Sequence, residues 1–187
     1  MRTETNTGWR KPGPVFRAPN AEVEASKDEL FAAMRLAVAA RRLRPSARHL
    51  LDHLVGCYGG MKIQDRFLVW PSNEFLMERT GLTERSIRYA LAELIREALI
   101  EARESANGKR FAVRAQNGQI VDAYGFDLTP LLLLRDEHQA AVDRLRALKA
   151  ARNMSFDQIT ICRRASREIL LALDEWSAGS ADYWQQF

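Results

Sequence analysis

The sequence predicts a mainly α fold with a small β-meander. In detail, this is a winged helix-turn-helix with flanking N-terminal helices and a C-terminal helical hairpin. Three observations predict it: a glycine turn at Gly81 separates two capped helical segments, β-rich segments with Asn-Gly turns follow, and apolar residues then recur at helical spacing. We expect a flexible arm over residues 1–25, a winged-helix domain over 26–129, and a helical hairpin with a C-terminal tail over 130–187.

The N-terminal part predicts an arm followed by two helices. Residues 1–25 are rich in proline and lack periodicity, which favours a flexible arm; their basic residues leave a DNA-contacting arm as the alternative. Ser26 predicts the start of a helix that ends near Arg42. Pro45 predicts the first turn of a second helix, which ends near Cys57.

The second helix carries His49, His53 and Cys57 on one face, because each lies four residues from the next. Histidine and cysteine are zinc ligands, so this spacing is compatible with a metal. However, three groups in a row on one helix cannot surround zinc tetrahedrally by themselves. We therefore interpret them as packing or solvent-facing residues, and we predict neither a metal nor another cofactor.

The next segment predicts a strand and two helices joined by a tight turn. Residues 66–70 form the strand, and Ser72 or Asn73 caps the helix after it. Gly81 supplies a left-handed C-cap, and Thr83 caps the next helix. The first helix is expected to bury Phe75, Leu76 and Met77. Helix, tight glycine turn and helix together are typical of a helix-turn-helix.

The second of these helices has two chemically different faces. Its apolar face consists of Ile87, Leu91, Leu94 and Ile95, and its other face of Arg85, Arg88, Tyr89 and Arg96. In a helix-turn-helix, residues near the start of the second helix contact the major groove, where arginine can bind guanine through two hydrogen bonds. The alternative is that the arginines form surface ion pairs with Glu74, Glu78 or Glu84.

Three β-rich segments follow, namely LIEARES, KRFAVRA and QIVDAYGFDL. They are separated by Asn107-Gly108 and Asn117-Gly118, which are strong hairpin signals. We expect the first hairpin to be the wing. The complete set of predicted DNA-binding residues is Ser72, Arg79, Thr83, Arg85, Ser86, Arg88, Tyr89, Lys109, Arg110 and Arg114. Thr83 and Ser86 are expected to help seat the helix, and the basic residues of the wing to hold the neighbouring DNA backbone or minor groove.

The C-terminal part carries two apolar seams with alternating steps of three and four residues. The first runs from Leu131 to Leu148 and the second from Ile159 to Trp176. Two seams separated by RNMSF predict an antiparallel helical hairpin or a pair of partner-binding helices. Homodimerisation and burial against the chain's own winged domain both remain open.

Composition and charge narrow the function classes. The formal net charge is +4, but residues 71–129 hold eight basic and nine acidic side chains, so a case for DNA depends on where the arginines point. There is no apolar run long enough for a membrane span and no secretory signal. Two distant cysteines indicate reduced thiols in a cytoplasmic protein. The NGKR stretch lacks the first glycine and the Ser or Thr of a phosphate loop, and we predict no enzymatic activity.

Several segments resemble the replication initiation protein C family of repABC-type plasmids. They are the leading GWRKP, VWPSN, GLTERSIRYAL, SANGKRF and IVDAYGFDLTPL. The resemblance is densest over residues 67–134. It implies a protein that binds the plasmid origin, which lies within the initiator's own gene, and that sets when replication starts. It also implies host replication machinery and plasmid partition proteins as partners.

Members of this family generally continue into a second domain. The sequence therefore corresponds to an N-terminal half or to a short relative, and a short relative favours a repressor or copy-control role. We predict a sequence-specific binder of double-stranded DNA that acts as a plasmid replication initiator at an AT-rich origin. The alternatives are a winged-helix transcriptional regulator and a protein-interaction module. Replacing Arg85 and Arg88 distinguishes these readings, because only DNA binders depend on them.

Overall fold

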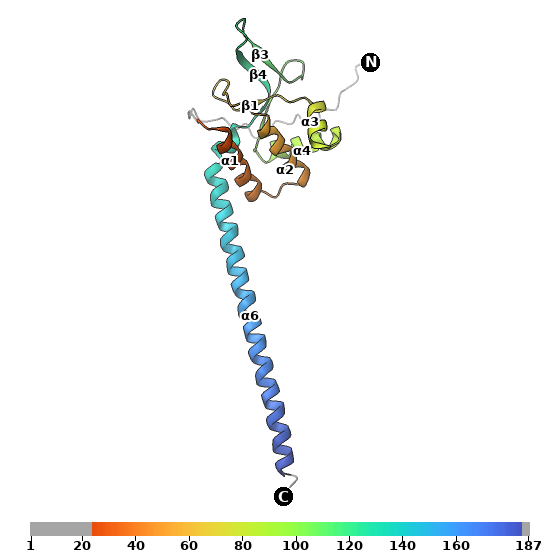
Figure 1. The fold of residues 1–187 in the computed structure, drawn as a ribbon, viewed down its shortest axis with the longest axis vertical. Coiled ribbons are helices and arrows are strands. Elements are labelled where there is room, and N and C mark those ends of the chain that lie inside the picture. The colour runs from red at the N-terminus through yellow and green to blue at the C-terminus, as the bar shows by residue number, and fades with distance from the viewer. Residues whose placement is uncertain (1–23, 185–187) are drawn as a thin grey trace. The chain divides into compact units, whose positions relative to one another are not determined.

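The computed structural model describes residues 24–184 and divides the chain into two compact units, Met1–Val142 and Asp143–Phe187. The described residues form six helices and one four-stranded antiparallel sheet, which confirms a mainly α fold with a small sheet (Figure 1). The predicted arm falls almost wholly on residues 1–23, outside the described residues. Within 24–184, we find no helix with the length and apolar character that crossing a membrane requires.

Helices α1 (Lys27–Ala40) and α2 (Pro45–Gly56) form where their caps predict. The Ser26 hydroxyl accepts a hydrogen bond from the Glu29 N–H at 3.2 Å, and the Glu29 carboxylate accepts one from the Ser26 N–H at 2.8 Å. This reciprocal arrangement satisfies two backbone donors at the start of α1. Pro45 occupies the first turn of α2, where its missing N–H costs nothing. Both predicted helices are confirmed.

Helices α3 (Asn73–Thr80) and α4 (Glu84–Arg96) are joined by a three-residue turn that begins at Gly81. Gly81 has a φ of 67°, the left-handed conformation that lets the chain leave α3 abruptly. Thr83 caps α4, because its hydroxyl accepts a hydrogen bond from the Ser86 N–H at 3.3 Å. Helix α2 packs against both helices. The two predicted helices and their tight turn are confirmed.

The buried face of α3 is narrower than the sequence predicts. Leu76 is fully buried, whereas Phe75 and Met77 are 39% and 38% exposed. Successive residues of a helix lie about 100° apart around its axis, so the two neighbours of Leu76 flank the buried direction. The prediction that Phe75 and Met77 face inward is therefore wrong.

The sheet is organised around its longest strand, β4 (Ile120–Asp127). The last residues of β4 lie between β1 (Leu68–Val69) and β2 (Glu101–Arg103), and both neighbours are antiparallel to it. Strand β3 (Phe111–Arg114) pairs with the first half of β4. The strand order is thus β1-β4-β2, with β3 on the free half of β4.

This pairing corrects the predicted first hairpin. Strand β2 pairs with residues 125–127 of β4, and β3 continues along residues 120–124, so β2 and β3 are not paired with each other among the described strands. Strand β4 is long enough to align both segments in succession. Residues 104–110 therefore form a loop between them, and the observed hairpin is the one that turns at Asn117-Gly118.

One glycine in β4 is required by close packing. A Cβ atom on Gly125 would lie 2.2 Å from the Val69 carbonyl oxygen and 2.9 Å from the Cα of Trp70. Both contacts are to backbone, which cannot rotate away. Gly125 therefore allows β4 to approach β1 closely.

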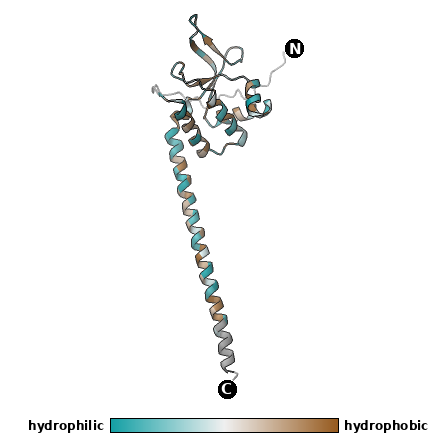
Figure 2. Ribbon diagram, viewed as in Figure 1, coloured by the Kyte–Doolittle hydropathy of each residue, from teal (hydrophilic) through white to brown (hydrophobic). Residues whose placement is uncertain are grey.

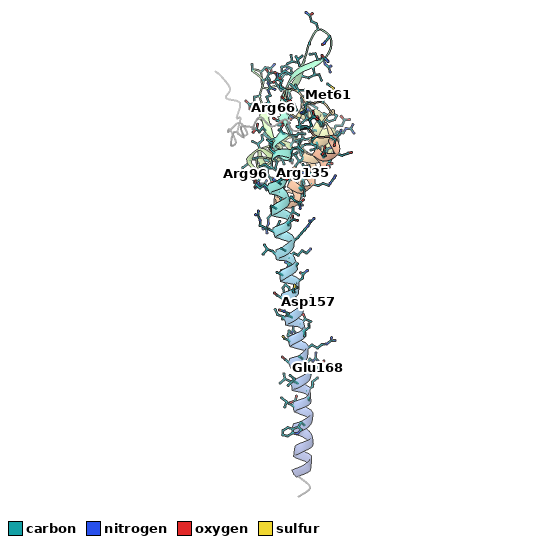
Figure 3. All side chains as sticks on the ribbon, turned by 90° about the vertical axis from the view of Figure 1, so that its left-hand side faces the viewer. Met61, Arg66, Arg96, Arg135, Asp157 and Glu168 are labelled. Atoms are coloured by element: carbon teal, nitrogen blue, oxygen red, sulfur yellow. The ribbon has the colours of Figure 1, made fainter. Side chains whose placement is uncertain are left out.

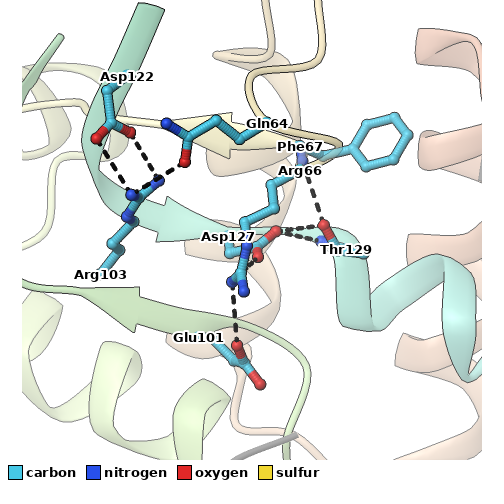
Figure 4. Close-up of polar contacts among 8 residues, drawn as sticks. All are labelled: Gln64, Arg66, Phe67, Glu101, Arg103, Asp122, Asp127 and Thr129. Carbon is cyan, nitrogen blue, oxygen red and sulfur yellow. Dashed lines mark hydrogen bonds and ion pairs between the residues drawn. The ribbon is translucent and has the colours of Figure 1, made fainter. Parts of the chain in front are cut away.

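A buried polar cluster connects the sheet to helix α5 (Thr129–Leu133) (Figure 4). The Asp127 carboxylate accepts hydrogen bonds from Arg66 Nη1 at 2.9 Å, from the Thr129 N–H at 2.9 Å and from the Thr129 hydroxyl. The Thr129 hydroxyl in turn accepts one from the Phe67 N–H at 3.2 Å. Because Asp127 is 2% exposed, these bonds satisfy a carboxylate that is otherwise costly to bury. The YGFDLTP segment thus has a structural role.

Helix α6 (Arg135–Trp184) begins in the first unit, where His138 is buried, and residues 143–184 form the described part of the second unit. The predicted helical hairpin is wrong, because RNMSF lies inside this helix. It contains neither Gly nor Pro, so nothing in it ends the helix. Side chains such as Asp157 and Glu168 project from the helix (Figure 3), and apolar residues alternate with polar ones along it (Figure 2).

Candidate nucleic-acid interface

The outer face of α4 is polar and exposed, as the sequence predicts. Ile87 and Leu94 on the opposite face are fully buried in the core of the first unit. Arg85, Arg88 and Tyr89 are exposed, and Tyr89 retains 56% of its accessible surface. Because the buried face anchors the helix, the exposed side chains have a fixed backbone from which to contact a partner.

Arg85 and Tyr89 form one unit on this face. The Arg85 guanidinium carbon lies 5.5 Å from the centre of the Tyr89 ring, and Arg85 Nη2 is 3.5 Å from the Tyr89 hydroxyl. Within the described residues, Arg85 has no carboxylate within ion-pair distance. This exposed cation–π contact contributes about 0.5–1 kcal/mol and leaves the charge of the guanidinium available to an anion.

Arg88 has a different environment. Its Nη2 is 2.8 Å from Glu84 Oε1, one helical turn earlier, and both side chains are about half exposed. The alternative of a surface ion pair is therefore realised for Arg88. Such exposed pairs contribute about 0–1 kcal/mol, so exchanging Glu84 for another anion costs little.

Arg110 is turned inward, unlike the residue beside it. Its guanidinium carbon lies 4.9 Å from the centre of the Phe126 ring, and its Nη2 donates a hydrogen bond to the side-chain oxygen of Asn73. Burial lowers the pKa of Arg110, and the nearby Glu74 carboxylate opposes that shift. Arg110 therefore fastens the 104–110 loop to the start of α3, whereas Lys109 is exposed on the loop.

The other predicted residues have mixed roles. Ser72 and Thr83 are helix caps whose hydroxyls accept backbone hydrogen bonds. Arg79 is exposed at the end of α3, with its guanidinium carbon 5.5 Å from the Phe75 ring. Arg114 is exposed on the β3–β4 hairpin, where its Nη1 donates to the Gly118 carbonyl at 3.0 Å. The Ser86 hydroxyl lies 3.0 Å from that of Thr83.

A pocket of about 440 Å³ lies between the start of α4 and the 104–110 loop. It brings together three predicted residues, Arg88, Lys109 and Arg110, but not the Arg85–Tyr89 pair. Its wall also contains Asn73 and Arg103, which the sequence reasoning missed as site residues. For Asn73 a signal existed, since it directly follows Ser72 in a predicted cap. The sequence gives no such signal for Arg103. Its Nη1 forms an ion pair with Asp122 Oδ1 at 2.7 Å (Figure 4).

His49 and His53 of α2 and Cys57, the residue that follows it, are not arranged as a metal site. The rings of His49 and His53 meet edge to face with centres 4.7 Å apart. Burial raises the pKa of the Cys57 thiol, which disfavours the thiolate that binds metals. Neither Cys57 nor Cys162 forms a disulfide in the described part of the chain. In the part of the chain that the structure describes, no three His, Cys, Asp or Glu side chains are grouped to hold an ion.

Comparison with known proteins places this geometry in context. The family described as Replication protein C N-terminal domain matches residues 15–173. A Rhizobium rhizogenes protein is 32% identical over 164 residues, which cover 86% of this chain and 40% of that relative. A Sinorhizobium fredii protein is 32% identical over 174 residues, covering 90% of this chain and 43% of the relative.

Both relatives carry the name replication protein C as a provisional assignment. The chain spans about two fifths of the length of these curated relatives. No solved structure matches it at a significant level.

Proposed function

The chain belongs to the replication protein C family, whose N-terminal domain it matches, and from this premise we propose that it binds the origin of a plasmid in a sequence-specific way. Its target is double-stranded DNA, and its role is to mark the place where replication starts. We propose no catalytic step by this chain.

The exposed Arg85–Tyr89 pair carries the proposal. Thr83 caps α4, which begins at Glu84, so Arg85 and Tyr89 lie in its first two turns. Side chains in this position of a helix-turn-helix reach base edges in the major groove. The exposed Arg85 guanidinium, which lies beside the Tyr89 ring, can donate two parallel hydrogen bonds to guanine, and the tyrosine hydroxyl can contact phosphate.

We further interpret the first unit as a winged helix, with α3 and α4 as the helix-turn-helix. In this interpretation the β3–β4 hairpin and the 104–110 loop serve as the wing. Lys109 and Arg114 are exposed there and would contact the DNA backbone. Arg110 would act indirectly, because it positions the loop against Asn73 and Phe126. Arg88 would exchange Glu84 for phosphate when DNA arrives.

Fluorescence anisotropy on two duplexes across a salt series tests the proposal. One duplex is tiled from the coding sequence of this chain, where the resemblance puts the origin, and the other is scrambled with equal AT content. We expect tight binding to one tile that persists as salt is raised, and weak binding to the scrambled duplex. Equal and salt-sensitive binding to both would show only non-specific affinity. Absence of binding to either would favour a protein-interaction module.

A further inference from the structure

The second unit exposes an unusual amount of apolar surface. Leu148 is 68% exposed, Ile159 55%, Leu173 55% and Trp176 73%. Large exposed apolar patches on a protein surface mark places where a partner binds. The question is which partner the helix between residues 143 and 176 fits.

Six large exposed apolar side chains of this helix fall on one line of positions, a seam that also includes three polar residues. Alternating steps of three and four residues give Leu145, Leu148, Arg152, Ser155, Ile159, Cys162, Ser166, Ile169, Leu173 and Trp176. Across RNMSF the spacing of three and four residues continues from Leu148 through Arg152 and Ser155 to Ile159. The two seams predicted from the sequence are therefore joined into one. Ser155, Ile159, Cys162 and Ser166 line one shallow groove together with flanking residues such as Gln158 and Arg163, as neighbours on one side of the helix would. This spacing is that of a coiled coil.

The two ends of the seam carry opposite charge. Residues 143–152 contain four basic and one acidic side chain, whereas residues 168–176 contain three acidic and no basic ones. Two copies in antiparallel orientation would therefore place the basic end of each beside the acidic end of the other. In parallel orientation, charges of like sign would instead be gathered at each end of the pair.

The seam residues also favour antiparallel pairing. With Ile159 opposite Cys162 of a second copy, Leu148 faces Leu173 and Ser155 faces Ser166. In the same register Leu145 faces Trp176. A parallel pair would instead place Arg152 against its own copy, which juxtaposes two guanidinium groups in the seam.

We propose that residues 143–176 bind a second copy of this chain as an antiparallel two-stranded coiled coil. The homodimer covers the apolar face that a hairpin within one chain would have covered. It also holds two DNA-binding units in one particle. The inference rests on the second unit alone and does not depend on the proposed DNA binding.

Charge substitutions in the full chain test both the partner and the orientation. Leu148→Lys and Leu173→Glu each put a charge into the seam, and each should convert a dimer to a monomer in sedimentation velocity. The double variant should restore the dimer, because lysine then faces glutamate in both antiparallel layers. Monomers for the unsubstituted chain at all concentrations would overturn the proposal. A double variant that stays monomeric would overturn the antiparallel orientation.

Matched controls exist on the same helix. Ile161 and Leu171 are 66% and 55% exposed, but they lie off the seam. Ile161→Lys and Leu171→Glu should leave the dimer intact while adding the same charges. If these controls dissociate the dimer as strongly as the seam variants, the seam is not the interface.

A cross-linking experiment measures the orientation directly. In a chain whose Cys57 and Cys162 are replaced by alanine, Ser155→Cys and Ser166→Cys are introduced separately. Antiparallel pairing predicts a disulfide only when the two variants are mixed, because Ser155 faces Ser166. Efficient cross-linking of either variant with itself would contradict this arrangement.

Discussion

Helix α4 and the second unit carry the same kind of apolar pattern and use it differently. In α4 the apolar stripe packs into the core of the first unit, where Ile87 and Leu94 are fully buried. In residues 143–176 a stripe of similar spacing remains open, and Leu148 is 68% exposed. The contrast shows that periodicity predicts that a helix face will be covered, but not what covers it. It also separates a unit whose apolar stripe packs within the chain from a helix whose stripe is exposed, for which we propose a second copy of the chain as the partner.

The most direct way to break this comparison is the same substitution in both regions. Leu94→Ala removes a fully buried side chain and should destabilise the first unit by about 2–5 kcal/mol. Leu148→Ala should change the stability of the first unit by less than about 0.5 kcal/mol, because its side chain is exposed. Urea unfolding followed by near-ultraviolet circular dichroism measures both. Similar losses from the two variants would contradict the comparison.

A glycine pair sharpens the role of packing in the first unit. Gly125→Ala should destabilise it by about 1–3 kcal/mol or more, because the new Cβ meets the Val69 backbone. Gly56→Ala introduces a Cβ with nothing within 4 Å in a helical position, and should be neutral or stabilising by up to about 1 kcal/mol. Thermal unfolding of both variants checks this order. An unaffected Gly125→Ala would mean that β4 does not approach β1 as described.

The 104–110 loop offers a comparison within the proposed DNA-binding surface. Lys109→Ala should weaken binding to all sequences alike and reduce the slope of log affinity against log salt by about one. Arg110→Ala should leave that slope nearly unchanged and instead increase hydrogen exchange in the loop, because Arg110 holds the loop to Asn73. Anisotropy across a salt series and hydrogen exchange distinguish the two. A larger loss of slope from Arg110→Ala would reverse the assigned roles.

The smallest expected effect concerns pH. His138 is 1% exposed and neither ring nitrogen has a hydrogen-bond partner in the described structure; burial and the nearby Arg41 lower its pKa below the ordinary 6.5, against the opposing effect of Glu137. The unfolded chain then takes up the proton more readily than the folded one. The contribution of His138 to stability is therefore present above about pH 6.5 and is lost as the pH falls through the lowered pKa.

His138→Leu should remove this part of the acid dependence. Thermal unfolding at about pH 7.5 and about pH 5.5 measures it, and the unsubstituted chain should lose more stability between the two than the variant. An equal loss in both would show that His138 is not the titrating group. In contrast to the buried His138, the described charged side chains of residues 143–176 are exposed.

Local signals in the sequence predicted much of the first unit. Ser26, Pro45, Gly81 and Thr83 begin or end helices as expected, because caps and breakers act within a few residues. The exposed face of α4 was predicted for a similar reason. Its buried and exposed residues separate cleanly on a helical period.

Features that depend on distant segments were not predictable in the same way. The Asn107-Gly108 turn is a strong local signal for a hairpin. However, β2 and β3 both pair with the long strand β4 and not with each other, so this turn lies in a loop. The sequence predicted Arg110 as an exposed cation. Its contacts with Asn73 and Phe126, which are distant in sequence, turn its side chain inward. The predicted helical hairpin was wrong because an apolar seam indicates that a helix face can pack against a partner, but it does not identify that partner.

One measurement tests the central claim most directly, namely that DNA binding belongs to the Arg85–Tyr89 face of the first unit. Anisotropy on the origin duplex and its scrambled control would compare Arg85→Ala with Arg164→Ala, which removes an exposed arginine from the second unit. Arg85→Ala should weaken origin binding by about 1–3 kcal/mol and reduce the preference for the origin. Arg164→Ala should preserve that preference. Unchanged affinity and preference in Arg85→Ala would contradict the account.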